Sequence, residues 1–342
     1  MAHLEEVSPV LNKTITSETV NNLTTADCNF TSEGFTIFKT IACILIFAIG
    51  IILNSLAFWV YFCHIPNTNA IIFYLKNLVI ADSLLVLSLP IKILKDNRPS
   101  ANLNKAYCSF IACIFYLNMY SSVFFLAYIA ATRYLKIVRP LRNYAFRNLK
   151  TAKRLSLGTW SILLLLAILF AILINKDNKP KLSNSPICLR DGVGQRAIYF
   201  FAHTAGLVMF FVVLAGICYC YLQISTQLHL LPSSPSLKKQ TKAKNNILIL
   251  LVVFFICFVP YHIIKLPYIL SQTELISDCY WQRVLYYAKE SSLLLSTLNA
   301  CFDPVIYFLF CKAFRSKLGL DKRALEPNEI SVPANASQVM LD

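Results

Sequence analysis

Seven long apolar stretches limit the folds that this chain can adopt. Each is nearly free of Asp, Glu, Lys and Arg, and each is long enough to cross a hydrocarbon layer of roughly 30 Å as a helix. They cover residues 35–62, 71–94, 106–132, 155–175, 197–229, 245–264 and about 286–310. Because only helices and closed barrels satisfy their backbone hydrogen bonds in lipid, this pattern predicts an all-α membrane protein built as a bundle of seven transmembrane helices.

The composition argues against a soluble globular fold. Of 342 residues, 57% are hydrophobic and only 14% are charged, which leaves too little polar surface for a soluble protein of this size. The connectors are short, so little of the chain is left for an extramembrane domain. We expect an N-terminal segment at 1–34, the bundle at 35–310, an amphipathic eighth helix along the membrane at 311–320, and a disordered tail at 321–342.

Positive charge on two connectors predicts the orientation in the membrane. Residues 134–154 hold seven Lys or Arg and no acid, and residues 230–244 hold four lysines. The positive-inside rule places both connectors in the cytoplasm. An odd number of spans then puts the N-terminus outside the cell, where three glycosylation sequons lie at Asn12, Asn22 and Asn29. We expect a multi-pass plasma-membrane protein whose net charge of +15 faces anionic lipid and not nucleic acid.

The twelve cysteines separate into two groups. Eight lie within apolar spans or at their inner ends, where free thiols behave as small hydrophobic groups: Cys43, Cys63, Cys113, Cys218, Cys220, Cys257, Cys301 and Cys311. The other four lie on the predicted outer side: Cys28, Cys108, Cys188 and Cys279. An oxidising compartment predicts two disulfides, and the sequence alone leaves three pairings open.

Two acidic residues occur deep in apolar spans. A charged side chain at bilayer depth costs at least ~2.5 kcal/mol, so Asp82 and Asp303 are candidates for a function. With Asn54 and Asn299 they predict a hydrated polar cavity that binds a sodium ion or water and rearranges on activation. The alternative is a hydrogen-bonded structural cluster.

Two prolines weaken the predicted sixth and seventh helices. Pro260 follows Phe254 and Phe258, and Pro304 stands between Asp303 and Tyr307. Because proline removes a backbone hydrogen bond, these sites allow the neighbouring aromatic side chains to repack. The alternative is that each proline only bends its helix.

Six motifs, in this order and spacing, resemble the signatures of rhodopsin-like G-protein-coupled receptors over about residues 35–320. They are Asn54, residues 78–82, residues 132–134, Trp160, residues 257–260 and residues 303–307. The resemblance implies a heterotrimeric G protein as partner and disulfides that pair Cys108 with Cys188 and Cys28 with Cys279. It also implies activation switches at Asn54, Asp82, Thr132, Arg133, Tyr134, Phe254, Phe258, Pro260, Asp303, Pro304 and Tyr307.

Within that family, further segments resemble the purinoceptors that sense ADP and UDP-sugars, together with orphan and peptide-responsive relatives. These segments are residues 72–77, 118–120, 258–268, 271–273 and 289–290. The resemblance implies coupling to inhibitory G proteins. It also implies that Tyr116 lies by the base and that four residues contact phosphates: His262, Lys265, Tyr268 and Lys289. Tyr120, in one of these segments, and Lys92, from the lysine pattern described next, complete the predicted ligand-binding set.

The lysine positions favour an anionic ligand independently of the family resemblance. Lys265 and Lys289 lie near the predicted outer ends of the sixth and seventh helices, with Lys92 and Lys95 on the opposite rim, so their ammonium groups can converge on phosphate. The alternative is that these lysines only extend to the lipid headgroups. A single histidine such as His262 is more often a packing residue, although its spacing from Lys265 favours the ligand.

The chain departs from the family at two places. Thr132 stands where the family usually has an acid, so control of Arg133 is weakened and raised basal signalling is expected. Around residues 198–203, the His and Asn that nucleotide-sensing relatives use are not found, which keeps a lysophospholipid or peptide ligand open. The absence of an internal repeat argues against a transporter or channel, and the absence of a catalytic motif argues against an enzyme. No cofactor is expected.

Overall fold

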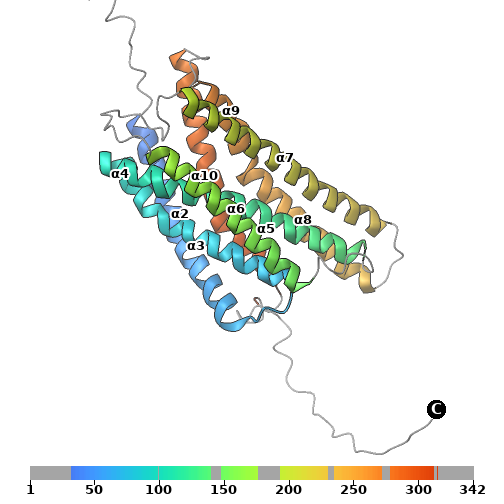
Figure 1. The fold of residues 1–342 in the computed structure, drawn as a ribbon. Coiled ribbons are helices and arrows are strands. Elements are labelled where there is room, and N and C mark those ends of the chain that lie inside the picture. The colour runs from blue at the N-terminus through green and yellow to red at the C-terminus, as the bar shows by residue number, and fades with distance from the viewer. Residues whose placement is uncertain are drawn as a thin grey trace, which may run out of the picture.

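The computed structural model describes residues 32–98, 100–139, 148–175, 193–229, 235–271, 278–311 and 314. These residues form one bundle of long helices (Figure 1), and no strand occurs in them. The helices are α2 (Glu33–Trp59), α3 (Ala70–Asn97), α4 (Ala101–Ala106), α5 (Ala112–Ile137), α6 (Leu149–Asn175), α7 (Val193–His229), α8 (Pro235–Cys257), α9 (Val259–Ser271) and α10 (Cys279–Phe310).

The seven apolar stretches correspond to seven helical passages, which confirms the predicted fold. Two passages contain a π-helical segment: η1 (Val60–His64) continues α2, and η2 (Tyr107–Ile111) joins α4 to α5. In the described part of the chain, six passages are long and apolar enough to cross a membrane. The seventh, α10, carries buried polar residues and packs against α2, α8 and α9.

Side-chain caps begin several helices where the sequence provides a short polar residue. The side-chain oxygens of Ser32, Asn69, Ser100 and Asp278 each accept a hydrogen bond from a backbone N–H in the first turn, at 2.9–3.2 Å. Such caps satisfy groups that the helix itself leaves unpaired.

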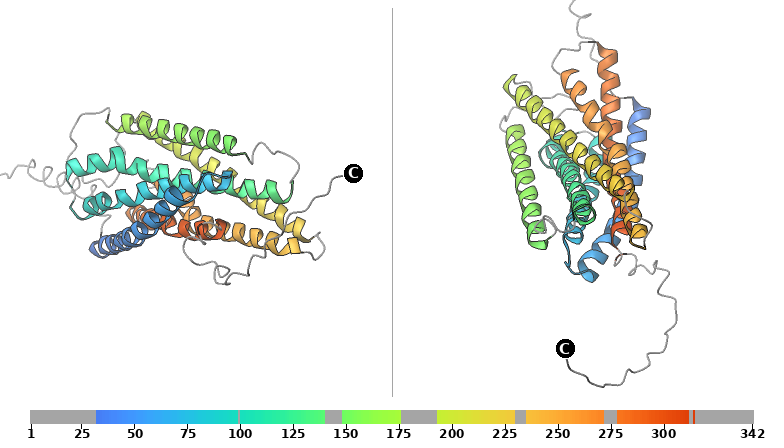
Figure 2. Two further views of the ribbon diagram at one scale, coloured as in Figure 1. Left: turned by 90° about the horizontal axis from the view of Figure 1, so that it is seen from below. Right: turned by 90° about the vertical axis from the view of Figure 1, so that its right-hand side faces the viewer.

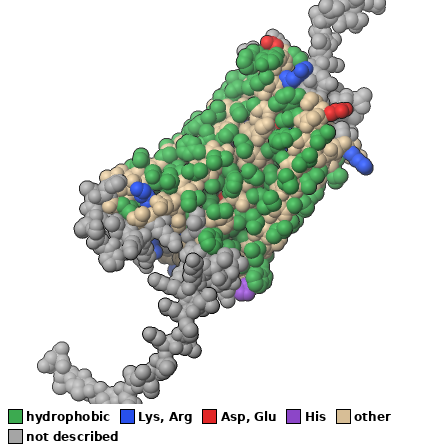
Figure 3. Space-filling model, turned by 180° about the vertical axis from the view of Figure 1, so that it is seen from behind, with side chains coloured by type: hydrophobic (Ala, Val, Ile, Leu, Met, Phe, Trp, Pro, Cys, Tyr) green, Lys and Arg blue, Asp and Glu red, His purple; other side chains and the backbone are tan. Residues whose placement is uncertain are grey.

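The surface of the bundle is apolar where a soluble protein would be polar. Ile52, Leu157 and Val212 are 68%, 69% and 66% exposed, and Figure 3 shows apolar side chains over most of one face. The helix α6 lies at the edge of the bundle in both views of Figure 2. These side chains suit contact with lipid tails, as the composition predicted.

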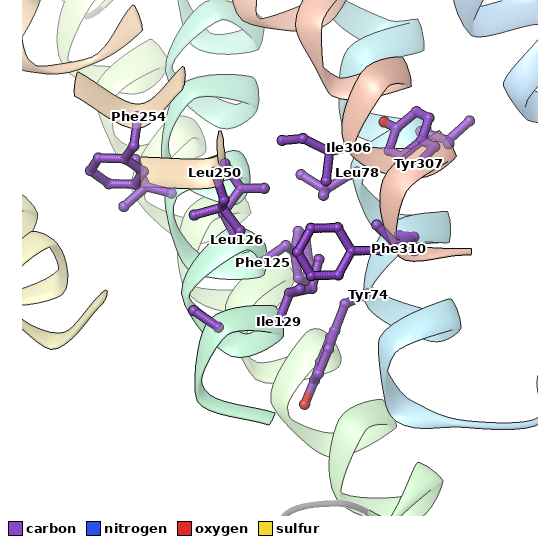
Figure 4. Packing of buried hydrophobic residues seen from close by; sticks show 14 of the residues in the cluster. Tyr74, Leu78, Phe125, Leu126, Ile129, Leu250, Phe254, Ile306, Tyr307 and Phe310 are labelled. Carbon is purple, nitrogen blue, oxygen red and sulfur yellow. The ribbon is translucent and has the colours of Figure 1, made fainter. Parts of the chain in front are cut away.

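The bundle has two different ends, which we call outer and inner after their predicted positions. The outer end holds Lys92, Lys265 and Lys289, and the inner end holds Arg133 and Phe310. The main hydrophobic core lies between the cavity described below and the inner end. There, side chains from α3, α5, α8 and α10, including Phe125 and Phe254, pack together (Figure 4).

The two prolines have different effects on their helices. The sixth passage is interrupted at Phe258, between α8 and α9, because Pro260 has no N–H to donate to the carbonyl of Ile256. The predicted weak point is therefore observed. Pro304 instead lies inside α10, which continues unbroken to Phe310.

Several predictions fall on parts of the chain that the structure does not describe. These are the N-terminal segment with Asn12, Asn22 and Asn29, the cysteines Cys28 and Cys188, and the tail 321–342. Of the predicted eighth helix, only Cys311 and Phe314 are described.

Candidate functional site

A polar cavity opens inside the outer end of the bundle. It has a volume of ≈ 80 Å³ and is lined by residues of α2, α3, α5, α6, α9, α10 and η2. Five lysines line it, together with one acid: Lys39, Lys92, Lys95, Lys265, Lys289 and Glu290. Pockets for drug-sized ligands usually measure roughly 300–1,000 Å³, so this cavity is smaller than a typical drug-sized pocket.

Glu290 on α10 is surrounded by lysines from three helices. Its carboxylate lies 3.5 Å from the ammonium of Lys39 and 3.9 Å from that of Lys92. It also accepts a hydrogen bond from Lys289, its neighbour in sequence. Glu290 is only 7% exposed, so these contacts are shielded from water and are stronger than surface ion pairs.

A second acid, Asp96 on α3, completes the ion-pair network. It lies 3.1 Å from Lys92, 3.5 Å from Lys95 and 3.7 Å from Lys39. The network therefore connects the outer ends of α2, α3 and α10. Among the described residues of the cavity and its network, five lysines face two acids, so the site has an excess of positive charge.

Lys265 and Lys289 approach the same aromatic ring. Their ammonium nitrogens lie 5.6 Å and 5.3 Å from the ring centre of Tyr268, and Lys265 is also 5.9 Å from the ring of Tyr261. Such cation–π contacts hold a lysine inside the bundle. Lys265 is 6% exposed, so its side chain lies inside the bundle and does not extend away from it toward the headgroups.

A chain of polar groups runs from the cavity to α7. The hydroxyl of Tyr261 donates to the hydroxyl of Tyr116 at 3.3 Å, and the hydroxyl of Tyr116 lies 3.3 Å from Nε2 of His203. These residues belong to α9, α5 and α7. The sequence predicted no role for His203. The sequence feature that could have identified His203 is its position inside an otherwise apolar span.

Two of the predicted ligand-binding residues do not line the cavity. His262 stacks on Phe210 with ring centres 3.8 Å apart, its Nδ1 lies 2.9 Å from the carbonyl oxygen of Phe258, and its Nε2 has no hydrogen-bond partner. Tyr120 packs against Gly206, where a Cβ atom would come within 2.4 Å of the hydroxyl oxygen. The other five, Lys92, Tyr116, Lys265, Tyr268 and Lys289, do line it.

Aromatic rings continue from His262 toward the core. Phe210 stacks on Phe254 at 5.2 Å, and Phe254 meets Phe258 edge to face at 5.2 Å. Phe258 is the residue at which the sixth passage is interrupted. Tyr261, which lines the cavity, meets His262 edge to face at 5.6 Å, so a shift of Tyr261 can reach the packing around the weak point.

The buried acid Asp82 accepts hydrogen bonds from two other helices. One carboxylate oxygen accepts from the side-chain amide of Asn118 on α5 at 2.9 Å, and the other accepts from the hydroxyl of Tyr307 on α10 at 2.7 Å. Asn118 was not assigned to this cluster from the sequence. Tyr307 has no exposed surface, so moving it requires both this bond and its packing to change.

Asp303 lies close enough to Asp82 for the two carboxyl groups to interact. Asn299 donates to Asp303 at 2.9 Å, and Asn54 donates to the carbonyl of Ala300 at 2.8 Å. One side-chain oxygen of each of Asn54, Asn299 and Asp303 has no hydrogen-bond partner among the described residues. Unpaired buried acceptors beside two acids fit a small cation or water. No group of three or more His, Cys, Asp or Glu suited to a metal occurs in the described residues.

At the inner end, Arg133 does not bond to its neighbour Thr132. The hydroxyl of Thr132 donates to the carbonyl of Tyr128 at 2.7 Å. Arg133 instead donates to the carbonyl of Phe310 at 3.3 Å, and its guanidinium lies 5.2 Å from the Phe310 ring. In this chain the arginine therefore connects α5 to the end of α10.

The cysteines follow the expected division as far as they are described. The eight cysteines of the apolar spans are free thiols, and Cys108 and Cys279 are disulfide-bonded. The pairing with Cys188 and Cys28 stays a prediction.

Residues 53–307 match the family model of the 7 transmembrane receptor (rhodopsin family). The chain belongs to this receptor family. The receptor is 37% identical to purinoceptor 14 of Bos taurus over 282 residues, which covers 80% of this chain and 82% of that protein. It is 35% identical to G-protein coupled receptor 87 of Mus musculus over 330 residues, 90% of either chain. It is 36% identical to purinoceptor 13 of Homo sapiens over 284 residues, 80% and 78% of the two chains.

These matches confirm the predicted family and its purinoceptor branch with orphan relatives. The receptor is a multi-pass membrane protein and not an enzyme. Its family implies an extracellular ligand and a G protein as partners.

Proposed function

We propose that the receptor lies in the plasma membrane with its N-terminus outside and binds an extracellular anion that carries phosphate, namely a nucleotide or nucleotide-sugar. It then signals through heterotrimeric G proteins of the inhibitory type. The observation that carries this proposal is the set of five lysines around one cavity.

The charge of the cavity supports an anionic ligand. A buried lysine is costly unless an anion or a hydrogen-bond acceptor compensates it. In the described network, Glu290 and Asp96 compensate only part of the positive charge. A phosphate or diphosphate group supplies the missing negative charge and several acceptor oxygens.

The aromatic lining supports a planar group beside the phosphate. Tyr116 and Phe170 line the cavity and meet edge to face at 6.2 Å. Rings of this kind pack well against a nucleobase. A nucleotide would need these side chains to move, because the volume of ≈ 80 Å³ is too small for a base and a sugar.

This small volume also supports the second candidate, a lysophospholipid whose phosphate headgroup enters the cavity. A peptide with an acidic side chain stays a third ligand class. All three ligand classes would use the same lysines, so ligand identity needs a direct screen.

The screen measures cyclic-AMP and calcium responses of cells that express the receptor, with ADP, UDP-glucose and lysophosphatidylserine as probes. Lys265→Gln and Lys289→Gln each remove a hydrogen bond between charged groups, worth about 1.5–3 kcal/mol. We expect the half-maximal concentration of the active probe to rise about 10- to 100-fold. Pertussis toxin should abolish the cyclic-AMP response.

The matched control is Lys105→Gln, because Lys105 is an exposed lysine of the short helix α4 and does not line the cavity. It should leave the response unchanged. A response to an anionic probe that survives both cavity substitutions would contradict the lysine site.

A further inference from the structure

The contacts of Glu290 resemble those of a bound ligand. One carboxylate meets ammonium groups on α2, α3 and α10, contributed by Lys39, Lys92 and Lys289. Glu290 itself lines the cavity. An anionic group therefore already occupies the point where these lysines converge.

A ligand phosphate cannot simply be added to this arrangement. The cavity of ≈ 80 Å³ places any anion close to the carboxylate, and two like charges at short distance in a buried site repel strongly. A phosphate that takes the three lysines must therefore take them from Glu290.

We propose that Glu290 is an internal counter-anion, which neutralises the lysines in the unliganded receptor and is displaced from them when a ligand phosphate binds. This inference rests on the proposed function, because it specifies how the same site passes from the unliganded to the liganded state. The exchange keeps the buried lysines paired with an anion in both states.

The exchange also changes a connection between helices. Lys39–Glu290 joins α2 to α10, and Lys92–Glu290 joins α3 to α10. The helix α10 runs unbroken from these contacts to Tyr307, which donates to Asp82. Displacing Glu290 therefore removes two of the contacts at the outer end of the helix whose inner part carries the Tyr307–Asp82 hydrogen bond.

Asp96 provides a matched comparison. It is buried in the same network and pairs with Lys39, Lys92 and Lys95, and none of its described ion pairs is with Lys289. If the total negative charge alone matters, Asp96→Asn and Glu290→Gln will change the affinity for a phosphate probe equally. If the position of the carboxylate matters, Glu290→Gln will have the larger effect.

The experiment uses the full-length receptor in lipid nanodiscs and measures its thermal unfolding midpoint at increasing concentrations of inorganic pyrophosphate. Pyrophosphate has no base or sugar, so it reports on the lysines alone. Without pyrophosphate, Glu290→Gln should lower the midpoint, because it leaves buried lysines without their partner. With pyrophosphate, the midpoint should rise further in Glu290→Gln than in the native receptor, and the apparent affinity should be about tenfold higher.

The other outcomes separate the two proposals. Equal stabilisation of the native receptor and Glu290→Gln, or weaker stabilisation of Glu290→Gln, would overturn the counter-anion and leave the lysine site standing. An absence of stabilisation in both would overturn the phosphate site as well. Lys265→Gln should reduce stabilisation in either background.

If Glu290→Gln does not fold, Glu290→Asp tests the same point. It keeps the charge and withdraws the carboxylate by one methylene group. We expect a smaller gain in pyrophosphate affinity in the same direction, and an unchanged affinity would overturn the inference.

Discussion

The outer and inner halves of the bundle are held together by different forces. In the outer half, buried lysines and two acids surround a small cavity, and the positive charge exceeds the negative charge among the described residues. In the inner half, aromatic and aliphatic side chains pack closely, and each carboxylate oxygen of Asp82 has a donor.

This difference indicates how a signal can pass through the molecule. The described part of the outer half has fewer negative than positive charges, and an anion can supply the difference. The inner half must exchange existing contacts, such as Tyr307–Asp82 and Arg133–Phe310. Ligand binding therefore adds negative charge to the outer half and changes existing contacts in the inner half.

The largest expected effect comes from the inner core. Phe254 has no exposed surface and contacts Phe210 and Phe258, so Phe254→Ala should cost about 3–5 kcal/mol of stability through the cavity that it leaves. The thermal unfolding midpoint of the receptor in nanodiscs measures this loss. Ile52→Ala, at a lipid-facing position, should change the midpoint little. Equal effects of the two substitutions would contradict a core that depends on packing.

A smaller effect is expected at the acidic pair Asp82 and Asp303 of the inner half. We propose that the unpaired oxygens of Asn54, Asn299 and Asp303 attract a sodium ion that favours the resting state. Replacing sodium chloride by choline chloride should then raise agonist potency several-fold in the native receptor, because the cation is removed. In Asp303→Asn this dependence should disappear. A sodium effect that persists in the variant would exclude this site.

Basal signalling tests the contact at the inner end. Thr132→Asp would place a carboxylate beside Arg133, and a partly exposed ion pair contributes about 0.2–1 kcal/mol. Basal G-protein activation, measured by nucleotide exchange without ligand, should fall up to about fivefold. Thr132→Asn has a similar shape without the charge and should leave it unchanged. Unchanged activity in Thr132→Asp would show that the Phe310 contact already controls Arg133.

A modest loss of potency should follow from His203→Phe. This change removes the contact with the Tyr116 hydroxyl, and a neutral hydrogen bond contributes about 0.5–1.5 kcal/mol. Agonist potency should fall about threefold to tenfold, with normal surface expression. A loss as large as that of Lys265→Gln would mean that α7 contributes directly to the anion site.

The sequence indicated which residues carry charge inside the bundle better than it indicated their partners. Lys92, Lys265 and Lys289 were predicted at the site and line it. Lys39 and Asp96 were not assigned to it, because the contacts of Lys39 with Asp96 and Glu290 join helices that are far apart in sequence. His262 had the right spacing from Lys265 and still does not line the cavity, because its ring stacks on Phe210 of α7.

The sequence by itself determined the number of helical passages, their approximate places along the chain and the family of the receptor. These features depend on local hydropathy and on motifs in fixed order, which need no knowledge of how helices pack. Only the tertiary structure decided that Glu290 lies among three lysines, that Asp82 bonds to Asn118 and Tyr307, and that Arg133 reaches Phe310. These contacts depend on how neighbouring helices are rotated and shifted against each other, and that arrangement follows from the packing of the whole bundle.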